Sequence, residues 1–130
     1  MSHRISWDND DHSVVLQEYI DGASKDDLYL LAEQSAKMLK SVDHTVHLII
    51  DERKLRVPFN MIDLRYLERQ IPRNQGVVVV IAQRQKQRVK AATHDLNRRI
   101  NGTGVEEPYF AETVEQAREM LHHQFGVQYP

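Results

Sequence analysis

Two continuous apolar runs dominate the hydrophobic pattern of the chain. The first is Val46 to Asp51 and the second is Gly76 to Ala82, with a segment of helical periodicity between them. Because neither run alternates with polar residues, each predicts a strand that is buried on both faces, as in a parallel sheet. Helices must then cover both sides of that sheet. The pattern therefore predicts an α/β fold.

The N-terminal part of the chain predicts a β-hairpin. Arg4 to Trp7 and Ser13 to Ile20 have the character of strands. The turn between them, Asp8 to Asp11, consists of Asp and Asn, which suit tight backbone turns. Ser13 to Ile20 alternates only in part, so we expect it near the edge of the sheet rather than in its middle.

Apolar residues that recur every three or four positions predict four helices. Ser24, Asn60 and Thr113 can cap three of them, and Pro72 and Gly126 can end two. The helices are expected at about 25–40, 61–71, 89–100 and 114–125, with a short strand at Pro108 to Ala111 before the last. The predicted order is β-β-α-β-α-β-α-β-α in one open, mostly parallel mixed sheet with helices on its faces, and we expect residues 1–130 to form one domain.

Composition and charge narrow the class of protein. Cysteine is absent, which excludes disulfides and thiolate metal sites and suits a reducing compartment. The apolar runs are too short to span a bilayer, and Met1 to Asp11 lacks the apolar core of a signal peptide. We therefore expect a soluble, cytoplasmic protein without membrane insertion.

The formal net charge is −2, which argues against a general preference for nucleic acid. Basic residues nevertheless gather between Arg84 and Arg99. We interpret them as the solvated face of a helix. A patch that binds an anion or RNA is expected to carry interleaved aromatic residues, which this segment lacks. We expect no nucleic-acid partner.

Several of these features together resemble the STAS domain, a family that includes sulfate-transporter tails and anti-sigma-factor antagonists. They are the leading hairpin, the strand ending in Asp51, the strand that starts at Gly76, and the short aromatic strand before a Thr-capped helix at Phe110 to Ala117. The resemblance implies a non-enzymatic regulatory module that binds a partner around the loop after the Asp-ending strand and the helix that follows.

One position departs from the family pattern. Many STAS domains carry a Ser or Thr just after the Asp, and a partner kinase phosphorylates it. Here Glu52 to Phe59 follow Asp51 and contain no hydroxyl side chain. We therefore expect no phosphoswitch, because its acceptor is missing. The chain is closest in this respect to divergent STAS-like proteins.

The ends of the two buried strands carry the candidate binding residues. Asp51 either offers a functional carboxylate to a cleft or caps the following turn. Basic residues near both strand ends either bind an anion above helix N-termini or are solvated charges. Phe59 either anchors a protein partner or staples the helix that Asn60 caps. The predicted partner- or anion-binding set is Asp51, Arg53, Arg56, Phe59, Asn60, Arg84 and Lys86.

No catalytic, cofactor or metal motif is visible in the sequence. The chain has no phosphate-binding Gly-rich loop, and its seven histidines do not form ligand pairs by local spacing. A site from His47, Asp51 and His94 would have to assemble through space. We expect no enzyme activity, cofactor or metal, although a hydrolase or phosphotransfer enzyme using Asp51 with one of these histidines is a third possibility.

Two binding functions remain open at this point. In the first, the protein is an interaction module that engages a protein partner or its own copy, as a homodimer, through the surface from Asp51 to Tyr66. In the second, it binds a small molecule, a lipid or an anion in a cleft at the strand C-terminal ends. A large apolar pocket in the structure would favour the second function.

Overall fold

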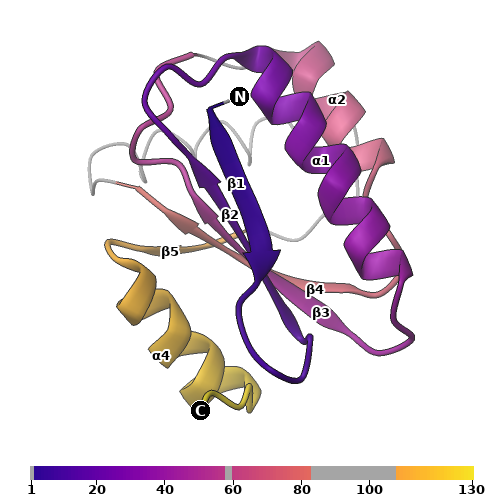
Figure 1. Ribbon diagram of the computed structural model, residues 1–130, viewed down its shortest axis with the longest axis vertical. Coiled ribbons are helices and arrows are strands. Elements are labelled where there is room, and N and C mark those ends of the chain that lie inside the picture. The colour runs from indigo at the N-terminus through magenta and orange to yellow at the C-terminus, as the bar shows by residue number, and fades with distance from the viewer. Residues whose placement is uncertain (1, 58–59, 83–107) are drawn as a thin grey trace.

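A five-stranded open sheet forms the centre of the protein (Figure 1). The computed structural model describes residues 2–57, 60–82 and 108–130. Strand β1 runs antiparallel to β2, and the other neighbours are parallel. The predicted α/β class and hairpin are therefore confirmed. In spatial order the strands are β1 (His3–Trp7), β2 (Val14–Tyr19), β3 (Val46–Asp51), β4 (Gln75–Ile81) and β5 (Tyr109–Ala111).

Three helices in the described part of the chain cover the two faces of the sheet. Helices α1 (Lys25–Lys40) and α2 (Met61–Arg69) lie together on one side, and α4 (Val114–Phe125) lies on the other (Figure 1). None of them is long and apolar enough to cross a membrane. The helix predicted at 89–100 lies outside the described residues. The arrangement is compatible with a STAS-like fold.

Strand β2 is second in the sheet, between β1 and β3. It is near the edge, as its mixed pattern predicts, but both of its faces are covered. Val14 and Val15, which point to opposite faces, are both fully buried. Helix α1 therefore covers one face of this strand while α4 covers the other.

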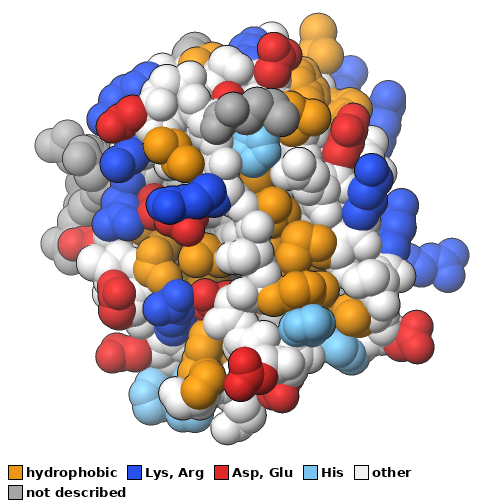
Figure 2. Space-filling view, viewed as in Figure 1, with side chains coloured by type: hydrophobic (Ala, Val, Ile, Leu, Met, Phe, Trp, Pro, Cys, Tyr) orange, Lys and Arg blue, Asp and Glu red, His pale blue; other side chains and the backbone are white. Residues whose placement is uncertain are grey.

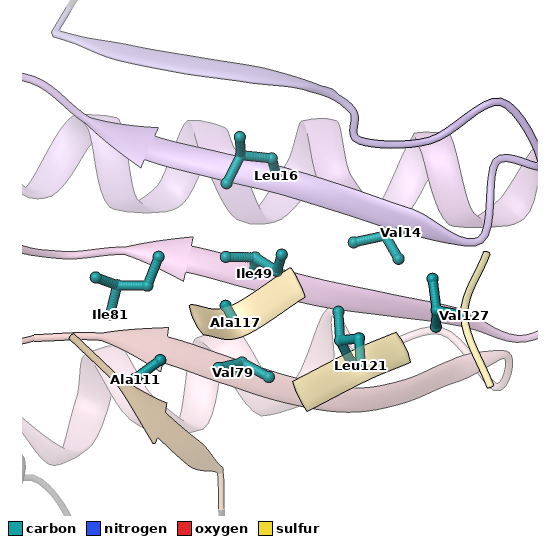
Figure 3. Packing of buried hydrophobic residues seen from close by; sticks show 9 residues of the cluster. All are labelled: Val14, Leu16, Ile49, Val79, Ile81, Ala111, Ala117, Leu121 and Val127. Atoms are coloured by element: carbon teal, nitrogen blue, oxygen red, sulfur yellow. The ribbon is translucent and has the colours of Figure 1, made fainter. Parts of the chain in front are cut away.

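The core on the α4 side joins all the central strands to that helix. Ala117 and Leu121 of α4 are fully buried and lie over Ile49 and Val79, as Figure 3 shows. Helical spacing of four residues places both on one face of α4, as predicted. The buried members of this cluster are Val14, Leu16, Ile49, Val79, Ile81, Ala111, Ala117, Leu121 and Val127.

The core on the α1 side is divided into two clusters. One lies at the N-terminal ends of β2 and β3, where Leu39 packs with Val15 and Leu48. The other lies near the start of α1, where Leu28 and Leu31 pack with Tyr19. Members of both clusters line the pocket described below, Tyr19 and Leu28 from the one and Leu48 from the other.

The predicted side-chain caps form at α2 and α4, and at α1 Asp27 accepts both the N–H of Ser24 at 2.8 Å and its hydroxyl at 3.2 Å. Asn60 accepts the Asp63 N–H at 2.9 Å, and Asp63 accepts the Asn60 N–H at 2.9 Å. Thr113 likewise accepts the Gln116 N–H at 3.1 Å, but the Gln116 side chain accepts the N–H of Glu112 instead of that of Thr113. The reciprocal hydrogen bond of a capping box is therefore displaced by one residue at α4, from the N–H of Thr113 to that of Glu112.

The turn of the hairpin is tied to the C-terminal segment. Asp8 accepts hydrogen bonds from the Arg118 guanidinium at 2.7 and 3.1 Å and from the Tyr129 hydroxyl at 2.7 Å. Asn9 is buried and donates to the Gln128 carbonyl at 3.1 Å. The polar turn residues thus stabilise contacts between distant parts of the chain as well as the turn itself.

Candidate functional site

A pocket of about 200 Å³ lies between the sheet and the two helices α1 and α2. Its floor comes from β2, β3 and β4, and its walls come from the two helices and the segment after α2. Most of the lining is apolar. The residues that line it are Gln17, Tyr19, Leu28, Ala32, Ser35, Ala36, Leu48, Ile50, Glu52, Leu64, Leu67, Glu68, Gln70, Ile71, Pro72, Gln75 and Val78.

The pocket exists because α2 packs loosely on the sheet. Asp63 is the one buried residue of α2, while Leu64 and Leu67 are only half-buried. Met61 and Ile71 share the apolar periodicity of Leu64 and Leu67, but they are about 40% exposed. The apolar stripe of this segment is therefore not pressed fully against the strands.

Polar contacts with α1 hold α2 in this position. Asp63 accepts hydrogen bonds from the Tyr29 hydroxyl and pairs with Lys25 Nζ at 3.1 Å. The Tyr29 hydrogen bond and the Asn60 N–H, in that order, lower the pKa of Asp63 to about 2. Tyr66 packs edge-on against Tyr29 and donates to Glu33 at 3.1 Å. Helix α2 is thereby anchored along α1, at a distance from the strands that leaves space beneath it.

Four polar side chains reach the pocket from buried positions. Gln17 and Tyr19 belong to the same face of β2, Ser35 enters from α1, and Glu52 directly follows β3. All are at most 9% exposed. Burial, and next the charge of Glu52, raise the pKa of the Tyr19 hydroxyl well above its usual range, so this hydroxyl stays protonated and can donate. The pocket thus combines apolar walls with a few hydrogen-bonding groups, as ligand sites do.

Ser35 is the most informative of these side chains. Its Oγ is buried and has no hydrogen-bond partner in the described part of the chain. A buried hydroxyl without a partner costs free energy, so native proteins rarely leave one in that state. Since Ser35 lines the pocket, a molecule bound there could supply the missing partner.

Asp51 lies on the opposite face of the sheet from the pocket. It is in register with Ile81, which belongs to the core under α4. Its carboxylate accepts two hydrogen bonds from the Arg53 guanidinium, at 2.7 and 3.0 Å, and a third from the Arg53 N–H. This bidentate pair raises the pKa of Arg53. The arrangement supports the capping interpretation of Asp51, because its acceptors are largely occupied within the loop.

The other predicted binding residues have different surroundings. Arg56 donates to the Arg53 carbonyl at 2.7 Å, and Asn60 caps α2. The structure therefore brings Asp51, Arg53 and Arg56 together in one loop. Phe59, Arg84 and Lys86 lie outside the described residues. Whether this loop contacts a partner or an anion stays a prediction.

The histidines do not form a metal site in the described ranges. No three His, Asp or Glu side chains gather there in a metal-binding arrangement. His47 Nδ1 instead accepts the Val77 N–H at 3.0 Å, and His94 lies outside the described residues. The geometry of a hydrolase, with His47 directed to Asp51, is thus not supported by the contacts of His47.

The residues of the pocket are not among those that the sequence predicts to bind a partner or an anion. Glu52 directly follows Asp51, a predicted binding residue at the end of β3, but it lines the pocket on the other face of the sheet. Two signals were available: Gln17 sits within the buried strand β2, and Ser35 lies on the inward stripe of α1. Polar residues at such positions indicate either a buried network or a site.

Comparisons with known proteins give no relative. No protein-family model matches the sequence, and neither the curated proteins nor the solved structures contain a match.

Proposed function

We propose that this protein is a non-enzymatic ligand-binding module of STAS-like architecture, which binds a small molecule in the pocket between α1, α2 and the sheet. The observation that carries the proposal is the Ser35 hydroxyl, which is buried in a mostly apolar pocket and has no hydrogen-bond partner among the described residues. The order of elements and the N-terminal hairpin support the STAS-like part of the proposal.

The size of the pocket limits the size of the ligand. An apolar cavity of about 150 Å³ is enough to bind benzene. At about 200 Å³ the pocket accommodates a single ring or a short branched chain with one polar group. A complete lipid would have to extend out of it.

The proposal can be tested by two-dimensional amide NMR during titration with benzyl alcohol. We expect saturable shifts at amides of α1, α2 and the neighbouring strand residues, such as Ser35, Ile50 and Leu67. Ala32→Leu would fill the pocket and abolish these shifts. Lys37→Leu, which adds the same side chain at an exposed position of α1, is the matched control and should bind as the native protein does. Equal binding by both variants would place the probe elsewhere.

A protein-interaction module is the second candidate. It is favoured by the exposed apolar side chains of α2, where Ile62 is 74% exposed and Met61 is 40% exposed. This helix belongs to the surface that the STAS resemblance associates with partners. Sedimentation of the native protein and of Ile62→Asp tests self-association through α2. A concentration-dependent dimer that is lost in the variant would support it, whereas two monomeric proteins would exclude self-association by this route.

A further inference from the structure

We infer that Gln17, Tyr19 and Ser35 form the polar end of the pocket and hold a ligand group that both donates and accepts hydrogen bonds, of the carboxamide class. These three side chains are called the polar triad below. The inference rests on the proposed function, because it names the chemical class of ligand that the same pocket takes.

The polar triad lies on the inner side of α1 and on the strand beneath that helix. Gln17 is 6% exposed, and Tyr19 and Ser35 are each 4% exposed. Figure 2 shows Lys and Arg side chains over the outer surface of α1 and α2, where contact with water accounts for them. Contact with bulk water does not account for polar side chains at the three inner positions. Buried polar groups need hydrogen-bond partners, since they otherwise reduce stability.

The polar triad finds no such partners within the described part of the chain. Ser35 Oγ has none there. The side-chain amide of Gln17 and the hydroxyl of Tyr19 likewise make no hydrogen bond to another described residue. All three side chains line the pocket. A molecule in the pocket can therefore hydrogen-bond to three groups that the described residues leave available.

The packing of α1 on β2 brings two members of the polar triad face to face. The inward residues of α1 at intervals of four are Leu31, Ser35 and Leu39, and the β2 residues on the facing side are Tyr19, Gln17 and Val15. Leu31 packs with Tyr19, and Leu39 packs with Val15. Four residues of a helix and two residues of a strand both advance by about 6–7 Å, so the two series stay in step. The middle residues, Ser35 and Gln17, therefore face each other.

Small neighbours keep the space between these two residues accessible. Ala32 and Ala36 lie beside Ser35 in α1 and also line the pocket. Larger side chains at both positions would cover the serine hydroxyl. A ligand group can thus reach Ser35 from α1 and Gln17 from the sheet at the same time.

The chemistry of the polar triad specifies the ligand group. The Gln17 amide carries both a donor and an acceptor, and a ligand carboxamide can pair with it through two hydrogen bonds, one in each direction. The Ser35 hydroxyl can donate to the second lone pair of the ligand oxygen. The Tyr19 hydroxyl can donate as well, because burial raises its pKa and keeps it protonated. A ketone only accepts hydrogen bonds, so it leaves the Gln17 oxygen without a donor.

Two probes of almost the same shape test this inference. Benzamide and acetophenone share a ring and a carbonyl group, and differ in an NH₂ group that replaces a methyl group. Each is titrated at pH 7 into the full chain, with backbone amide NMR shifts as the readout. We expect benzamide to bind about fivefold or more tightly, which corresponds to about 1 kcal/mol and to one net hydrogen bond. Without that hydrogen bond benzamide should bind more weakly, because its NH₂ group would lose its contacts with water.

Matched variants connect the preference to the polar triad. Gln17→Met removes the amide at nearly constant size and should abolish the preference for benzamide over acetophenone. Gln124→Met makes the same change at an exposed position of α4 and should keep the native preference. Ser35→Ala should reduce the preference, and it keeps the inference testable if Gln17→Met does not fold. Its control is Ser6→Ala, at an exposed position of β1.

The outcomes distinguish failure of the inference from failure of the proposed function. If acetophenone bound as tightly as benzamide, or if the pocket variants kept the native preference, the inference would be overturned. The pocket would still be a ligand site in both cases, since the probes would shift the amides around it. If neither probe shifted those amides, the proposed function would fail together with the inference.

Discussion

His47 Nδ1 accepts the backbone N–H of Val77 at 3.0 Å, across an irregularity in the pairing of β3 with β4. Val46 pairs with Gln75, but Leu48 pairs with Val78, so β4 has one more residue than β3 in this interval. Such a bulge leaves a backbone donor without a partner in the ladder. The imidazole satisfies that donor, and His47 is therefore part of the sheet's hydrogen bonding.

This contact predicts a loss of stability in mild acid. Burial lowers the pKa of His47 from its usual value near 6.5, and only the neutral ring can accept at Nδ1. The unfolded chain therefore takes up the proton more readily, and the free energy of unfolding should fall as the pH falls below about 6.5. Urea unfolding at pH 7.5 and pH 5.5 measures the effect.

A variant whose acceptor does not titrate shows whether His47 causes this pH dependence of stability. His47→Asn keeps an acceptor near the position of Nδ1 and should show a smaller difference in stability between the two pH values than the native protein. His44→Asn, at an exposed position, is the control and should retain the native difference. An unchanged pH dependence in His47→Asn would assign the effect to another group.

Gly76 leaves the space that His47 occupies. A Cβ at this position would lie 2.6 Å from His47 Cε1 and 2.8 Å from Thr45 Cγ2. Gly76→Ala should therefore destabilise the protein by about 1–3 kcal/mol through overpacking. Urea unfolding of Gly76→Ala in the native background and in His47→Ala tests this cause. A smaller loss in His47→Ala would agree with a clash, and an equal loss would contradict it.

Removal of the Arg53 side chain should destabilise the protein more than removal of an ordinary surface arginine, because Arg53 pairs with Asp51. The Asp51 side chain is only 10% exposed, so Arg53→Ala would leave a mostly buried carboxylate with fewer partners. We expect a loss of about 1–3 kcal/mol in urea unfolding. Arg4→Ala is the control, because Arg4 is 70% exposed and its contact with Glu18 is 3.4 Å long. Equal effects of both variants would show that the bidentate pair contributes little.

Truncation of a leucine to alanine should lower the free energy of unfolding by different amounts in α4 and α2, which lie on opposite faces of the sheet. Leu121→Ala in α4 removes a fully buried side chain and should cost about 2–5 kcal/mol. Leu67→Ala in α2 removes a half-buried one beside the pocket and should cost about 1 kcal/mol. Chemical denaturation of both variants gives the comparison. A cost at Leu67 as large as that at Leu121 would mean that α2 packs more tightly than its exposure indicates.

The elements of the fold could be predicted because local signals and burial agree in them. The apolar runs of β3 and β4 match their positions inside a sheet that is covered on both faces. Helix α1 has its predicted bounds, since the caps and the apolar stripe indicate the same residues. The near-edge place of β2 also followed from its pattern, because β1 adds a strand outside it.

The pocket could not be predicted from the same signals. Its presence depends on how far α2 stands from the strands, and that distance is set by contacts between residues distant in sequence, such as Tyr29 and Asp63. The stripe of α2 has the same periodicity whether it is pressed on the sheet or not. Glu52 could not be identified for a further reason. It lies at the start of a loop, where the sequence does not show to which face of the sheet a side chain points.

The ties between the hairpin turn and the C-terminal segment have a kinetic consequence. The hydrogen bond from Tyr129 to Asp8 joins residues 121 positions apart, so it closes a loop of almost the whole described chain. Contacts of such long range are expensive in chain entropy until the sheet between them exists. We expect them to form after the rate-limiting step of folding. Tyr129→Phe should accordingly speed unfolding and leave the refolding rate nearly unchanged in stopped-flow measurements. The hydrogen bond between Tyr129 and Asp8 would then slow the unfolding of the native protein without affecting how fast it folds.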